Sequence, residues 1–154
     1  MTTAVAVRKV VNNIPVSVKT KRVSQNALNI PLTFDEHLAV KIPPHISMIE
    51  MQEGRGTSTD WFNTCYRIVC GLRIVEMCYT QSTIEEYKLG FDSIQKVREH
   101  YLQSGKWEFT SKEDIDNVSS CLRSVDDMQD EINRETLLFC FKKARTFVTK
   151  YIKS

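Results

Sequence analysis

The sequence of 154 residues lacks the short motifs that mark nucleotide-binding loops and zinc sites. It has neither a Gly-x-Gly-x-x-Gly fingerprint nor a Walker-type loop, and no Cys-x-x-Cys pair. Its three histidines, His37, His45 and His100, also lack the His-Glu-x-x-His spacing of a metalloprotease helix. We therefore expect no cofactor, no metal and no enzymatic activity. A Cys–His nucleophile pair stays open, because its two members need not be close in sequence.

Long apolar runs and paired cysteines are also missing. The N-terminal apolar run is too short before Arg8 and Lys9 for a signal peptide, and residues 65–75 are too short and too interrupted by Arg67 and Arg73 to span a membrane. An odd number of cysteines on apolar helix faces indicates free thiols in a reduced compartment. The five are Cys65, Cys70, Cys78, Cys121 and Cys140. These features predict a cytoplasmic protein that does not enter a membrane.

The prolines divide the chain near residue 57. All four precede that point, where short stretches alternate apolar and polar residues, as in Ile14, Val16, Val18 and again in Leu38, Val40, Ile42. This alternation predicts an extended or small β N-terminal arm over residues 1–57. A hydrophobic fraction of 42% and a length of 154 residues suit one well-packed core, which we place in residues 58–154.

Helical periodicity begins after residue 57 and predicts a three- to four-helix bundle, so the fold class is mainly α. The first helix starts at an N-cap of Ser58 or Thr59, and the second runs from a capping box at Thr83 to a C-cap at Gly105. A third starts near Thr110. Its apolar stripe shifts phase near residues 133–136, which favours a break into a fourth helix over one continuous helix.

The first helix is apolar on nearly all sides, which predicts a central position with the other helices around it. Gly71 in its middle indicates a close helix crossing, since glycine costs about 1 kcal/mol there against alanine. One polar stripe remains, and we expect it to face solvent or a partner. It consists of Asp60, Asn63, Thr64, Arg67 and Gly71.

Two sets of residues are candidates for binding a protein partner. The polar stripe with Trp61 as an aromatic anchor is one, and an acidic run with Trp107 in an exposed link is the other. Each set could instead be a solvent-exposed helix face with no role in binding. The candidate residues are Asp60, Trp61, Asn63, Arg67, Trp107, Asp126, Asp127, Asp130 and Glu131.

Basic segments support an alternative function in binding nucleic acid. Lysine and arginine alternate with Phe147 and Tyr151 over residues 142–153, a mixture that can contact phosphates and stack on bases. A solvated final helix, whose cations complement its own dipole, would have the same composition. The candidate residues are Lys19, Lys21, Arg22, Lys142, Lys143, Arg145 and Lys150.

Residues 60–135 resemble a group of small proteins encoded on bacterial prophages and plasmids. The resemblance is carried by DWFNTCYRIVCGLRIVEM, by GKWEFTSKE and by VDDMQDEINRE, and it covers about half the chain. It implies a mobile genetic element and an intracellular setting, in which small helical proteins often bind and inhibit host proteins, including defence systems. The group has no established activity to assign to any residue.

The sequence thus predicts a non-enzymatic protein-binding module, such as a phage- or plasmid-encoded modulator of a host complex, that docks by steric or charge complementarity. Its partner would be a host or phage protein complex. A nucleic-acid-binding regulator is the alternative, and self-association through the N-terminal arm stays open.

Overall fold

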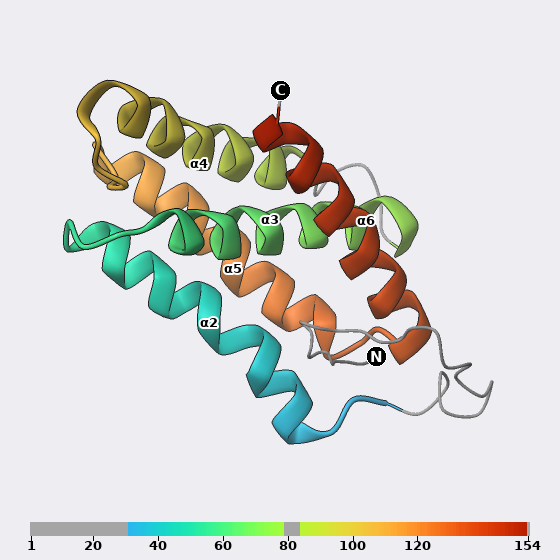
Figure 1. Cartoon of the computed structure of the whole chain (residues 1–154). Helices are drawn as coiled ribbons and strands as arrows, with labels where there is room; N and C mark the ends of the chain where they lie inside the picture. Colours follow the sequence, from blue (N-terminus) through green and yellow to red (C-terminus); the bar gives the residue numbers. More distant parts are fainter. Residues whose placement is uncertain (1–30, 79–83, 154) are drawn as a thin grey trace.

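A computed structural model describes residues 31–78 and 84–153, which fold into a bundle of α-helices (Figure 1). The helices are α2 (Phe34–Gln52), α3 (Ser58–Cys78), α4 (Ile84–Ser104), α5 (Lys112–Gln129) and α6 (Arg134–Lys153). Within this part of the chain there is no β-strand, and one antiparallel bridge joins Gly56 to Trp107. The prediction of a mainly helical bundle is confirmed. Most of the predicted arm, residues 1–30, lies outside the described residues.

The prediction of an extended segment is wrong for residues 34–52, which form α2. This helix begins at a capping box, in which the Thr33 hydroxyl accepts from the N–H of Glu36 and the Glu36 carboxylate accepts from the N–H of Thr33. Pro43 and Pro44 lie inside it, although each removes one backbone donor. Burial of its inner face against α3 and α5 outweighs that loss. The buried residues are Pro44, Ser47, Met48 and Met51.

The helix α3 occupies the centre of the bundle and contacts α2, α4, α5 and α6 (Figure 1). Its core residues come from all sides of the helix, as the sequence predicts. The buried residues are Trp61, Thr64, Cys65, Arg67, Ile68, Val69, Cys70, Gly71, Ile74 and Val75. Because Met48 and Met51 of α2 belong to the same apolar core, α2 packs as part of the bundle rather than as an arm beside it.

Glycine at position 71 allows the close helix crossing that the sequence predicts. A Cβ atom on Gly71 would lie 2.4 Å from a ring carbon of Tyr87 on α4, well inside contact distance. Gly90 plays the same part between α4 and α5, where a Cβ would lie 2.2 Å from the Cys121 sulfur. Both glycines therefore let neighbouring helices approach closely at positions that a larger residue would crowd.

The helix ends follow local capping chemistry. Thr57 caps α3, one residue earlier than predicted: its hydroxyl accepts from the N–H of Asp60, and its own N–H donates to the Asp60 carboxylate. The helix α4 ends at Gly105 with a φ of 79°, in agreement with the predicted C-cap. Ser111 caps α5 by accepting from the N–H of Asp114, so the predicted cap at Thr110 is displaced by one residue.

The break between α5 and α6 falls at residues 130–133, close to the predicted position. Asn133 caps α6, because its side-chain oxygen accepts from the N–H of Thr136. The change of helix direction thus depends on an asparagine cap and needs neither glycine nor proline.

Candidate functional site

The expectation that the polar stripe of α3 faces solvent or a partner is wrong for Thr64, Arg67 and Gly71, which neighbouring helices bury. Asp60 is used in the cap of α3, and the Thr64 hydroxyl donates to the Asp60 carbonyl 2.9 Å away. Asn63 is half-buried and donates to the Ser47 hydroxyl on α2. Arg67 has only 1% of its surface exposed. The stripe therefore contributes to helix packing.

Arg67 forms a buried ion pair with Asp126 of α5. Its Nη2 donates to Asp126 Oδ1 at 3.0 Å, and His45 of α2 contacts the other carboxylate oxygen at 2.7 Å. The Nε and Nη1 atoms of Arg67 are buried without a hydrogen-bond partner among the described residues. Asp126 is therefore the acid that compensates the buried guanidinium, and it joins three helices.

One further acid of the run, Asp130, contacts α2. Asp130 accepts from Lys41 Nζ at 2.7 Å and lies 3.7 Å from His37, whose ring contacts Gln129 at 2.8 Å. Burial and the Lys41 charge lower the pKa of His37, although Asp130 acts in the opposite direction. Asp127 and Glu131 are exposed. Two of the four predicted acids thus bind α2 of the same chain.

A bidentate pair also joins α2 to the start of α6. Arg134 donates to both carboxylate oxygens of Glu36, at 3.2 and 2.6 Å. Burial alone would raise the pKa of Glu36, but the hydrogen bonds from Arg134 and Thr33 outweigh it and lower that pKa. With the contacts of Asp126 and Asp130, this pair attaches residues 36–45 of α2 to α5 and α6.

Trp61 is a core residue rather than an exposed anchor, with only 2% of its surface exposed. Its indole N–H donates to the Ile94 carbonyl on α4 at 2.7 Å. The Trp107 ring lies 5.9 Å from that of Trp61 and stacks on Tyr101 at 4.0 Å. Trp107 is half-buried, so the link that carries it is attached to the bundle through an aromatic cluster.

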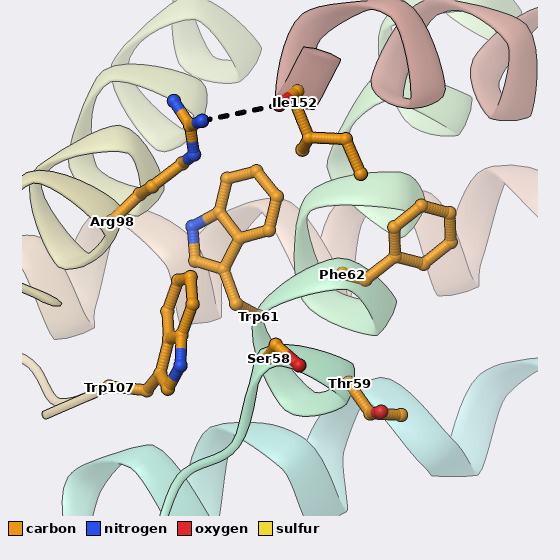
Figure 2. Close-up of a pocket in the computed structure, with 7 residues that line it drawn as sticks. All are labelled: Ser58, Thr59, Trp61, Phe62, Arg98, Trp107 and Ile152. Atoms are coloured by element: carbon orange, nitrogen blue, oxygen red, sulfur yellow. Dashed lines mark hydrogen bonds between the residues drawn. The ribbon is translucent and has the colours of Figure 1, made fainter. Parts of the chain in front are cut away.

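Next to this cluster a pocket of about 330 Å³ opens at the surface. Figure 2 shows Trp61 between Trp107 on one side and Phe62 on the other, with Arg98 and Ile152 closing the far end. The pocket therefore combines α3, α4, α6 and the link before α5. Sequence reasoning finds Trp61 and Trp107 but misses their juxtaposition, because residues far apart in the chain build the pocket.

The outer face of α2 carries an apolar ridge that the sequence analysis misses. We define the ridge as Ile42, Ile46 and Ile49, which follow one another at i, i+4 and i+7 on one face. Their exposed fractions are 45%, 55% and 54%. Because the opposite face of α2 lies in the core, this helix is apolar on two sides. The sequence contains the helical spacing of the three isoleucines, but the strand-like alternation of Leu38, Val40 and Ile42 in the same segment favours an extended structure.

The basic residues predicted on the last helix lie on the exposed side of α6. They are Lys142, Lys143, Arg145 and Lys150. Phe139 and Phe147 are exposed among them, with Lys143 over the ring of Phe139 and Arg73 over that of Phe147. Lys19, Lys21 and Arg22, the other members of the predicted basic set, lie outside the described residues. The structure therefore leaves a basic and aromatic face on α6.

The thiols offer little nucleophilic chemistry. Burial raises the pKa of Cys65 and of Cys70 to about 12, and in Cys70 it does so despite the neighbouring Arg67. Cys121 is buried with a pKa of about 12, and Cys78 is exposed with a pKa also raised by burial. These thiols stay protonated near neutral pH. Among residues 31–78 and 84–153, no cluster of three or more histidine, cysteine or acidic side chains could hold a metal ion.

No family model, curated protein or solved structure matches the chain. None of the described helices combines the length and apolar character needed to cross a membrane.

Proposed function

We propose that the chain is a protein-binding module that docks through the ridge on α2. The observation that carries this proposal is the exposure of three isoleucines, Ile42, Ile46 and Ile49, in a row on one helix face. Single exposed apolar residues are ordinary, but a contiguous group on a rigid element is typical of a protein interface. An apolar helix face entering a groove is a common mode of recognition.

The attachment of α2 favours docking without rearrangement. Its inner face lies in the core, and its polar contacts reach α5 and α6 through Asp126, Asp130 and Arg134. A helix held along its length presents its outer side chains in fixed positions, which reduces the entropic cost of binding. Asp35 and Glu53, both exposed, continue the same helix face by spacing at its two ends. A complementary partner would offer an apolar groove between basic groups.

The mechanism would be steric: the chain covers a surface that its partner needs for another interaction. The resemblance to proteins of mobile genetic elements suggests a host complex in the bacterial cytoplasm, including a defence system, as the partner. The acidic run contributes less than the sequence predicts, since Asp126 and Asp130 are occupied within the chain. Asp127 remains exposed for charge complementarity.

Lysine in place of two ridge residues, Ile46→Lys with Ile49→Lys, is expected to abolish capture of the partner from lysate of the source cell. Each lysine would bring a charge into an apolar contact. The two substitutions together should weaken binding by a factor of about 100, or about 2.7 kcal/mol. Affinity capture with quantitative mass spectrometry measures the loss. Thermal unfolding should be nearly unchanged, because surface substitutions usually alter stability by about 0.5 kcal/mol or less.

Leu89→Lys is the matched control, since Leu89 lies on α4 with 54% of its surface exposed, the same fraction as Ile49. It should capture the partner as the unchanged chain does. Equal recovery of the same proteins by the ridge variant and the control would contradict docking through the ridge.

The basic face of α6 supports a second candidate, a nucleic-acid-binding regulator. Exposed Phe139 and Phe147 among four cations can combine stacking with phosphate contacts. This candidate predicts binding of generic duplex DNA that weakens by about 10-fold or more between about 50 and 200 mM salt. Lys142→Glu with Lys143→Glu should then reduce the salt dependence, as measured by fluorescence anisotropy. No binding of DNA or RNA at the lower salt concentration would eliminate the candidate.

A further inference from the structure

We infer that the pocket beside Trp61 binds an acidic peptide of a partner protein that inserts one apolar side chain. This inference rests on the proposed function only in taking a protein as the ligand, because it concerns a site away from the ridge.

The walls are apolar and fixed. The indole N–H of Trp61 is bound to the Ile94 carbonyl, so the ring offers carbon to the pocket rather than an unpaired donor. Trp107 is held by stacking on Tyr101, and Phe62 stacks near Tyr66 with ring centres 6.1 Å apart. Rings held in this way lose little conformational entropy on binding.

The size of the pocket suits one or two side chains. Its volume of about 330 Å³ is at the lower end of the range for sites that enclose a drug-sized molecule. Two exposed residues at the start of α3, Ser58 and Thr59, belong to its lining, so the pocket is open to the surface there. A chain could therefore lie across the opening while one of its side chains enters.

One arginine lines the pocket, and a second lies against one of its aromatic side chains. The Arg98 guanidinium in the pocket wall is 5.4 Å from the ring centre of Tyr151. The Arg145 guanidinium, outside the lining, is 5.8 Å from the ring centre of Phe62. Among the described residues, neither arginine forms an ion pair. This includes Glu99, the acid next to Arg98 in sequence, which does not pair with it. Arg98 makes one long hydrogen bond, of 3.4 Å, to the Ile152 carbonyl.

Acidic groups near the pocket are already used. The Asp60 carboxylate binds Thr57, and the Glu108 carboxylate contacts His100 at 2.9 Å. One guanidinium in the pocket wall and a second against the ring of Phe62 therefore favour a ligand with carboxylates beside an apolar side chain. A nucleobase fits less well, because Trp61 is almost fully buried and its ring is inclined by 41° to that of Trp107, which leaves no flat exposed stacking surface.

Tryptophan fluorescence of the purified chain provides the test, since the two tryptophans of the sequence both line the pocket. The probes are three capped peptides: Ac-DEFDD-amide, its uncharged counterpart Ac-NQFNN-amide, and Ac-DEADD-amide without the apolar side chain. We expect Ac-DEFDD-amide to bind about fivefold more tightly than the uncharged peptide, from two partly exposed ion pairs. It should bind about 10-fold more tightly than the alanine peptide, because a buried phenyl ring is lost.

The double variant Arg98→Gln with Arg145→Gln should bind the charged and uncharged phenylalanine peptides equally. Arg123→Gln, which changes an exposed arginine of α5 outside the pocket, should retain the fivefold preference. Unchanged unfolding curves for both variants ensure that the fold is intact. The inference is overturned by equal affinities for the three peptides, by no binding up to about 1 mM, or by tighter binding of AMP than of Ac-DEFDD-amide.

Failure of this test is distinguishable from failure of the proposed function. The peptide titration uses a defined ligand and changes the pocket, whereas the capture experiment changes the ridge on α2. A chain that captures its partner through the ridge but ignores acidic peptides would overturn the pocket inference alone.

Discussion

Asp126→Ala is expected to lower the free energy of unfolding by about 3 kcal/mol, because it leaves a buried charge without compensation. Arg67 is 1% exposed, and Asp126 is the acid in contact with it. Two guanidinium nitrogens of Arg67 already lack a hydrogen-bond partner among residues 31–78 and 84–153. Removing the carboxylate also frees His45 of α2. Urea denaturation followed by circular dichroism measures the change.

The neighbouring acid supplies the control for this prediction. Asp127 is exposed, so Asp127→Ala should change stability by about 0.5 kcal/mol or less. Adding Arg67→Leu to Asp126→Ala should restore part of the lost stability, because a buried ion pair can often be replaced by apolar side chains at little cost. Equal effects of the two alanine substitutions would mean that Asp126 is an ordinary surface acid.

Trp61→Ala is expected to lower the free energy of unfolding by about 3–5 kcal/mol, as loss of a large aromatic side chain from a core does. Trp61 packs near Trp107 and Tyr151, and its N–H is bonded to Ile94. Trp61→Phe keeps most of the ring contacts but loses the hydrogen bond, so it should cost about 1–2 kcal/mol. Chemical denaturation distinguishes the two variants.

Trp107→Ala is the comparison that separates a core role from a binding role. Trp107 is half-buried at the surface of the same aromatic cluster, so its loss should cost less than that of Trp61. If Trp61→Ala leaves stability intact and removes only binding, the sequence interpretation of Trp61 as an aromatic anchor for a partner would be correct and the structural one wrong.

Much of the helical architecture can be predicted from the sequence, because local chemistry sets the helix ends. Gly105 ends α4, and the change of phase near residue 133 correctly indicates a new helix. The central position of α3 follows from its apolar character on nearly all sides, and Gly71 correctly indicates a close crossing. These features depend on residues close together in sequence or on the composition of one helix.

The helix α2 could not be predicted in the same way, since its local signals conflict. Pro43 and Pro44 disfavour a helix, and Leu38, Val40 and Ile42 alternate as in a strand. The capping box of Thr33 and Glu36 favours a helix, and packing on α3 and α5 decides the outcome. Once α2 is helical, the ridge of Ile42, Ile46 and Ile49 appears on its outer face.

The error over the polar stripe has a different cause. A helical row that contains Asp60, Asn63 and Arg67 is expected to face solvent unless an acid is known to pair with the arginine. That acid, Asp126, is 59 residues away from Arg67 in sequence. The sequence places an arginine on one helix and an acid on another but cannot show that they meet. The same limit applies to the pocket, where Trp61 meets Ile152 from the other end of the chain.

Photo-cross-linking from the ridge would show whether the chain binds a protein through α2. Benzoylphenylalanine would replace Ile46 in one variant and Leu89 in the other, two positions with nearly equal exposure. After irradiation in lysate treated with nuclease, the account predicts one cross-linked protein from position 46 and none from position 89. No cross-link from position 46, or the same proteins from both positions, would contradict it.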